Sequence, residues 1–77
     1  MGVTAQKVFI PQHVTGSAKQ HYRDLCEQLG GPPAESWRVM KLGNLAILED
    51  KHHRGKADEI ELTIMQRERR LLGLPPQ

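Results

Sequence analysis

Lysine, arginine and histidine side chains gather in two short stretches of the chain, and these residue types are well suited to contact phosphates. The first stretch is 51–56 and the second is 67–70. In the first, Gly55 would allow close approach of a phosphate while several donors reach it at once. An ordinary solvated surface is the alternative. The residues expected to bind duplex DNA are Lys51, His52, His53, Arg54, Lys56, Arg67, Arg69 and Arg70.

Cysteine and histidine could also form a metal site or a nucleophile. His21 and Cys26 are five residues apart, and His52 and His53 are adjacent, whereas structural zinc sites use ligand pairs such as Cys-x₂₋₄-Cys or His-x₃₋₅-His. We therefore expect no metal and no other cofactor. The sequence has no glycine-rich phosphate loop and no Gly-x-Ser-x-Gly motif. The chain is thus expected not to be an enzyme, with Cys26 as a small core residue.

Two pairs of acidic residues flank the first basic stretch, Glu49-Asp50 on one side and Asp58-Glu59 on the other. Paired carboxylates act as a general acid and base when burial shifts their pKa values. We expect both pairs to lie instead at solvated helix ends, because charge runs usually form a solvated face. They are not expected to form a catalytic site.

The chain is short, with 77 residues and a formal net charge of +2. We expect a single small domain over residues 1–77, because domains usually have about 100–150 residues. Chains of this size bury only about 60% of their unfolded surface, so oligomerisation or a partner is expected. No apolar run approaches the roughly 18 residues needed to span a membrane. The single cysteine cannot form an internal disulfide, which favours a reducing compartment such as the cytoplasm.

The first third of the chain predicts an arm followed by a helix. Residues 1–13 read as an extended arm, in which the β-prone run 7–10 stops at a proline. Ser17 and Gln20 have the spacing of a capping box. A narrow apolar stripe with helical spacing follows, made of Ala18, Tyr22, Leu25 and Leu29. A Gly-Gly-Pro-Pro run would end this helix, which is expected over 17–29.

The middle of the chain allows two structures. Plotted as a helix, the apolar side chains of segment 37–48 spread around most of the circumference, so such a helix must be buried on several sides, typically by sister chains. Plotted as strands, residues 38–48 form a hairpin with Gly43-Asn44 as its two-residue turn. Length and charge favour the helix, which a first-turn proline at position 33 could open.

The last third predicts another helix. Ile60, Leu62 and Ile64 alternate as in a strand, but the acidic residues before them and the arginines after them complement a helix dipole at both ends. We therefore expect a helix over 57–72, stopped by Gly73. Its apolar residues form two stripes, Ile60, Ile64 and Leu71 in one and Leu62, Met65 and Leu72 in the other.

The fold class expected from these elements is mainly α. It consists of the short extended arm followed by a small bundle or hairpin of about three helices, with an α+β fold containing a hairpin at 38–48 as the alternative. Two apolar stripes on one helix indicate contact with two neighbours. The residues expected at an interface are Trp37, Met40, Ile47, Ile60, Ile64 and Leu71.

Two stretches of the sequence resemble the small subunit of the tailed-phage DNA-packaging terminase. Residues 10–19 read Ile-Pro-Gln-His-Val-Thr-Gly-Ser-Ala-Lys, followed by Tyr22 and Leu25, and are similar to the opening of that family. Residues 71–75 read Leu-Leu-Gly-Leu-Pro and are similar to its closing element, and the segment 45–60 resembles its long charged helix. The chain differs in being shorter, because a Gly-Pro turn replaces a longer connection.

The resemblance implies a non-catalytic helical subunit that assembles into a homo-oligomer. Such a viral protein would bind phage DNA at the packaging start and recruit a larger ATPase-nuclease partner. It would act in the bacterial host cytoplasm and carry no metal or nucleotide of its own. The basic turn at 51–56 would then face the DNA.

Two other functions remain open from the sequence. In a ribbon-helix-helix repressor or antitoxin, the run 7–10 would pair with its counterpart in a sister chain and place Lys7 and Phe9 in the major groove. In a protein-interaction module, such as a phage-encoded inhibitor of a host enzyme, the apolar surface around Trp37, Met40 and Ile47 would bind another protein.

Overall fold

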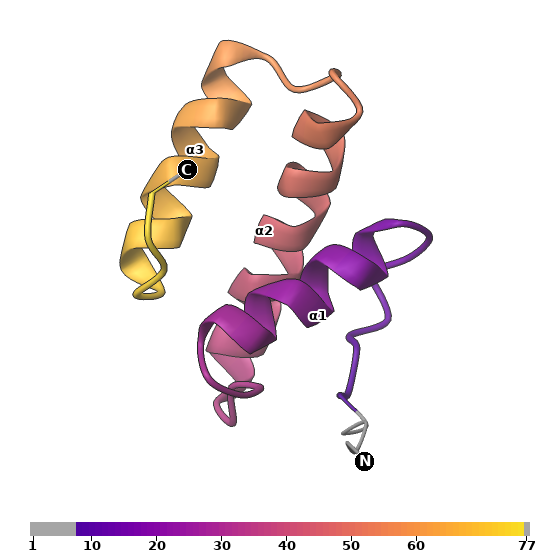
Figure 1. The fold of residues 1–77 in the computed structure, drawn as a ribbon, viewed down its shortest axis with the longest axis vertical. Coiled ribbons are helices and arrows are strands. Elements are labelled where there is room, and N and C mark those ends of the chain that lie inside the picture. The colour runs from indigo at the N-terminus through magenta and orange to yellow at the C-terminus, as the bar shows by residue number, and fades with distance from the viewer. Residues whose placement is uncertain (1–7, 77) are drawn as a thin grey trace.

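Three helices make up the fold, and the second of them is central (Figure 1). The computed structural model describes residues 8–76, with helices α1 (Ala18–Gln28), α2 (Ser36–His53) and α3 (Glu59–Leu71). Both α1 and α3 pack against α2, and none of the described residues is in a strand. The mainly α fold with about three helices is therefore confirmed. No helix in this part of the chain is long and apolar enough to cross a membrane.

Helix α2 is apolar around most of its circumference because the other two helices lie on different sides of it. Leu42, Leu45 and Ala46 are fully buried, while Ile47 and Leu48 are partly buried against the same core. The middle of α2 is therefore covered without a sister chain, while Trp37 and Met40 in its first turns stay exposed. The alternative hairpin at 38–48 is wrong, because its proposed turn residues lie in the middle of α2.

Helix α1 forms close to its expected bounds, but its N-terminus is built differently from the prediction. Ser17 has helical φ and ψ angles, and its side chain makes no capping hydrogen bond with any residue the structure describes. Instead, the backbone N–H groups of residues 18–20 donate to the carbonyls of residues 15–17. The N–H of Gln20 is thus taken by the backbone carbonyl of Ser17, and the predicted capping box does not form.

The α3 helix uses one of its two predicted stripes within the chain. Met65 and Leu72 are buried and Leu62 is partly buried, all in the common core. After α3 the chain folds back along the helix (Figure 1), and Leu74 is buried in the same core. The other stripe of α3 stays outside.

Glycines end all three helices by the same hydrogen-bond pattern. Gly55, with a φ of 74°, donates its N–H to the carbonyl of His52, and the next N–H, that of Lys56, donates to the carbonyl of Lys51. These are the two bonds of a Schellman motif, which needs the left-handed backbone that glycine adopts without steric cost. The ends at Gly30 and Gly73 repeat both bonds.

The described part of the arm packs against the core. Within its described part, Val8 and Ile10 pack partly buried against the core, and the adjoining Val14 is fully buried. The Nε2 atom of His13 is buried and has no hydrogen-bond partner among residues 8–76. Lys7, which the ribbon-helix-helix hypothesis places in the major groove, lies outside the described residues.

Tyr22 provides a test of this core at high pH. The side chain is only 1% exposed, and burial, followed by the neighbouring Cys26, raises its pKa to about 12 from an ordinary value of 10.0. The folded state disfavours the tyrosinate. The contribution of Tyr22 to the free energy of unfolding is therefore fully present below pH 10 and is lost as the pH rises through about 12. Burial likewise raises the pKa of the Cys26 thiol.

We expect the ultraviolet absorbance of tyrosinate, followed against pH, to rise only well above pH 10 and together with any loss of helical circular dichroism. Tyr22 is the single tyrosine of the chain, so the signal has one source. Ionisation near pH 10 with unchanged helical signal would contradict the burial of this side chain.

Candidate nucleic-acid interface

Three of the eight basic residues predicted to contact DNA form ion pairs within the chain. Lys51 Nζ lies 2.6 Å from Glu61 Oε2, and Arg54 Nε lies 3.2 Å from Asp50 Oδ2. Arg69 pairs with a buried carboxylate. The first two cations keep 40% and 54% of their side chains exposed, so only Arg69 is removed from the surface.

The other five are exposed and have no carboxylate partner among residues 8–76. They divide into two groups by their place on the fold. His52, His53 and Lys56 lie at the end of α2 and in the turn to α3, and Arg67 and Arg70 lie near the end of α3. At about 1.5 Å per residue, Arg70 is roughly 16 Å along the helix from its start. The structure therefore makes two separate basic groups, of which the first is the denser.

The turn between α2 and α3 is fixed at both of its ends. The Gly55 Schellman motif ends α2, and Asp58 begins α3 by accepting the N–H of Glu61 at 2.8 Å. The Glu61 carboxylate accepts the backbone N–H of Asp58 in return at 3.1 Å, which completes a capping box. The spacing Asp-x-x-Glu is a capping-box pattern that the sequence already contains. Lys56 therefore lies in a short turn whose two ends are fixed by hydrogen bonds.

The ion pair of Lys51 with Glu61 joins the end of α2 to the start of α3. The Lys51 ammonium donates to the Glu61 carboxylate, and this bond, followed by the backbone N–H of Asp58, holds the pKa of Glu61 below its ordinary value. The Glu61 carboxylate therefore stays ionised to lower pH than an ordinary glutamate, and it still offsets the charge of Lys51 at that pH. Lys51, His52 and His53 lie in the last turn of α2, whereas the sequence predicts them in a turn over 51–56.

The prediction for Arg69 is wrong. Its side chain is 3% exposed. The guanidinium lies between the helices and therefore cannot reach a phosphate. Nη1 donates to Glu49, Nη2 donates to Gln28 Oε1 at 3.0 Å, and Nε donates to the carbonyl of Pro75 at 2.7 Å. These bonds join α3 to α2, to α1 and to the C-terminal segment. Arg69 is a structural residue.

Glu49 and Asp50 also differ from the prediction of a solvated helix end, since both are buried. Glu49 is the counterion of Arg69, and Asp50 lies within 3.5 Å of His21 and 3.2 Å of Arg54. Each buried carboxylate is therefore paired, which is the condition under which charges are tolerated in a core. The acidic pair Asp58-Glu59 is exposed at the start of α3, as predicted.

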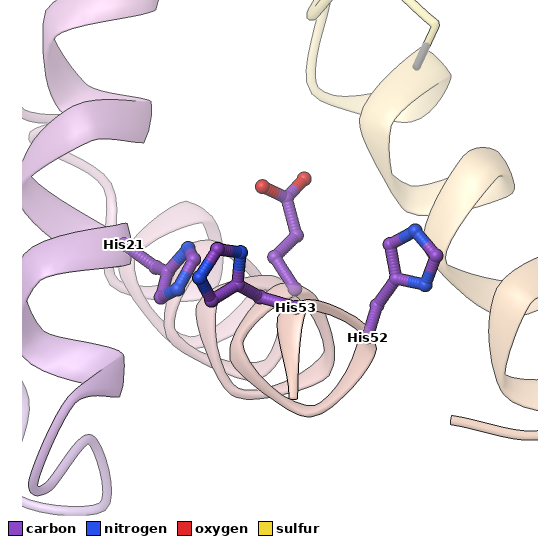
Figure 2. Close-up of a pocket in the computed structure, with 4 residues that line it drawn as sticks. His21, His52 and His53 are labelled. Carbon is purple, nitrogen blue, oxygen red and sulfur yellow. The ribbon is translucent and has the colours of Figure 1, made fainter. Parts of the chain in front are cut away.

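Beside the turn is an open hollow of about 500 Å³, lined by His21, Glu49, His52 and His53. In Figure 2, the rings of His21, from α1, and His53, from α2, face each other, and His52 points towards α3. The two facing rings have centroids 5.7 Å apart and are tilted by 59°. Within residues 8–76, no group of three or more histidine, cysteine, aspartate or glutamate side chains is arranged to hold a metal ion. The imidazole N–H groups can instead donate to phosphate oxygens.

The predicted interface residues are mostly on the surface. Trp37 and Met40 are exposed in the first turns of α2, and the Arg38 guanidinium lies 5.0 Å from the centre of the Trp37 ring. Ile47 is the exception, because it is partly buried against the core of its own chain. The three predicted residues of α3, Ile60, Ile64 and Leu71, are all exposed.

The sequence reasoning missed the paired core charges. Glu49 and Arg69 are 20 residues apart, so no local spacing pattern connects them. A weak signal was present, because Arg69 occupies the position between Met65 and Leu72 on the buried stripe of α3. Charged residues on an apolar stripe are usually paired when they are buried.

Comparison with protein-family models, with curated proteins and with solved structures gives no match for this chain.

Proposed function

We propose that this chain is a non-catalytic, oligomeric DNA-binding protein. Its role would be that of a phage terminase small subunit, which recognises viral DNA for packaging and recruits an ATPase-nuclease partner. The observation that supports DNA binding is the turn between α2 and α3, where His52, His53 and Lys56 are exposed without a carboxylate partner in the described chain. An exposed lysine binds the phosphate backbone by releasing its counterions, and histidine ring N–H groups can donate hydrogen bonds to phosphate oxygens.

The α2–α3 turn supports this proposal better than the arginines of α3. Lys51 and Arg54 are paired with carboxylates, but their side chains remain 40% and 54% exposed beside the unpaired basic residues. The hollow next to it is lined by three histidines and by Glu49, whose carboxylate is paired with Arg69, and the histidine ring N–H groups extend the same surface. In the proposed complex, a DNA backbone follows the turn, and the histidines donate hydrogen bonds to its phosphates.

Substitution of Lys56 by alanine tests this surface. We expect weaker binding to a labelled duplex of mixed sequence, and a plot of log K against log salt that is shallower by about one unit, because one phosphate contact is lost. Fluorescence anisotropy at several salt concentrations measures both. The double substitution H52A/K56A is expected to weaken binding further.

Lys19→Ala is the matched control for this experiment. Lys19 is an exposed lysine on α1, so the substitution removes the same charge from a different surface. We expect it to leave the salt dependence nearly unchanged. Equal effects of Lys19→Ala and Lys56→Ala would show that any binding is non-specific attraction to a basic protein and would overturn the assignment of the turn.

A ribbon-helix-helix protein would respond differently to substitution in the arm. There, Lys7→Ala should abolish DNA binding, whereas the proposed complex at the turn should be unaffected. The cytoplasm, of the bacterial host if the chain is phage-encoded, is the proposed compartment, and the free, buried thiol of Cys26 agrees with a reducing environment.

A second candidate function is that of a protein-interaction module. Trp37 and Met40 favour it, because they lie three residues apart on one face of α2 and are 47% and 52% exposed. Large exposed apolar side chains of this kind often anchor protein interfaces. The same surface could bind the larger partner that the first proposal requires. Binding of a protein with no measurable DNA affinity at low salt would favour the interaction module alone.

A further inference from the structure

The outward face of α3 carries an apolar stripe that the chain itself does not cover. Ile60, Ile64 and Leu71 are 71%, 36% and 58% exposed. Together with Arg67 they follow spacings of four, three and four residues, which is the pattern of one seam of a two-helix packing. The opposite face of α3 is already packed on the core through Met65 and Leu72.

The charges beside this stripe are arranged unequally on its two edges. On the edge towards α2, Glu61 and Glu68 are neutralised by Lys51 and Lys41 of that helix. On the other edge, Glu59 and Arg70 are exposed, and neither has an ion-pair partner among the described residues. They are eleven residues apart, which is about three helical turns, so they lie on the same line along the helix.

We propose that this face binds a second copy of the same chain, with the two α3 helices antiparallel about a two-fold axis. In that arrangement, Ile60 of each copy packs on Leu71 of the other, and Ile64 packs on the alkyl stem of Arg67. Glu59 of each copy then lies beside Arg70 of the other, at both ends of the contact. The two helix dipoles also run in opposite directions, which is favourable.

Charge decides the direction of the pair. A parallel pair about a two-fold axis would instead place the edge of Glu59 and Arg70 against the partner's other edge, which carries Glu61 and Glu68, so Glu59 would face a carboxylate and could not reach Arg70. An isologous contact also repeats every favourable pair twice. The stripe and its charged edge are therefore self-complementary only when the helices are antiparallel.

The α3 contact between two copies would be the oligomer contact of the proposed function. It rests on that function only for its biological purpose. It assigns Arg67 and Arg70 to the second copy, and leaves the α2–α3 turn for DNA. The association is measured without DNA, and DNA binding is tested at the turn. Failure of one proposal is thus distinguishable from failure of the other.

Sedimentation equilibrium of the full chain, over a wide concentration range without DNA, tests the contact. We expect the wild-type chain to associate in even-numbered multiples, and Ile64→Asp to raise the dissociation constant at least about a hundredfold. Circular dichroism should confirm that the variant remains helical, as expected for a surface position. Asn44→Asp is the matched control, because it introduces the same carboxylate at an exposed position of α2, and it should leave this association unchanged.

Charge exchange gives a second test that does not alter the apolar stripe. Glu59→Arg and Arg70→Glu should each weaken association about tenfold, because each places like charges at both ends of the contact. The double variant E59R/R70E restores opposite charges in the antiparallel pair and should recover wild-type association. A monomeric wild-type chain at high concentration, or a double variant as weak as the single variants, would overturn the proposal.

Discussion

Replacement of Arg69 by alanine is expected to lower the free energy of unfolding by about 3–5 kcal/mol. The substitution leaves the carboxylate of Glu49, whose side chain is 7% exposed, in the core without its counterion. It also removes the donors to Gln28 and to the carbonyl of Pro75. Small domains are stable by only about 5 kcal/mol at the lower end of the usual range. We therefore expect urea denaturation, followed by circular dichroism, to show an unfolding transition at low urea, with at most about 2 kcal/mol of stability left.

Two further variants separate the causes of this loss. Arg23→Ala removes an exposed arginine from α1 and should change stability by less than about 0.5 kcal/mol. The double substitution E49L/R69M removes both charges but keeps much of the buried volume, so it should recover most of the loss. A loss below about 1 kcal/mol for Arg69→Ala alone would show that the buried charge network contributes little.

The example of Arg69 shows where sequence reasoning reaches its limit in this protein. Helical spacing of apolar residues and the glycine after each run predicted the first and third helices, and length and charge favoured the middle helix over a hairpin, because all of these signals are local. The pairing of Glu49 with Arg69 is a tertiary contact, and a pattern along the chain cannot tell a solvated charge from one that another helix covers. The prediction therefore counted Arg69 as a DNA contact.

Helix α2 shows a related limit. Its apolar circumference correctly indicated burial on several sides, but the sequence could not say whether the covering elements belonged to this chain or to another one. The structure assigns that role to α1 and α3. The second stripe of α3 is the opposite case. Helical spacing predicted this stripe as well, but its three apolar residues remain exposed within the described part of the chain. Of the predicted DNA contacts, Lys56 and both histidines of the α2 end are exposed as expected.

Gly43 gives the second large effect. A Cβ atom at this position would lie 2.6 Å from His13 Nε2 and 3.0 Å from Val14 Cγ2. Gly43→Val is therefore expected to destabilise the fold by about 2–3 kcal/mol and to displace the arm, because the added branched side chain overpacks a buried contact. Urea denaturation measures the free energy of unfolding, and limited proteolysis before residue 14 measures release of the arm.

Alanine substitutions distinguish this contact from the ordinary effect of a glycine in a helix. At an exposed position, replacing glycine by alanine stabilises a helix by about 1 kcal/mol, but at Gly43 the gain is opposed by the His13 ring. H13A/G43A removes that ring, whose buried Nε2 has no partner among residues 8–76, so the double variant should be more stable than G43A. The exposed neighbour Asn44 is the control, since N44A should not release the arm. If Gly43→Val kept both full stability and a protected arm, the arm could not pack against α2 as described.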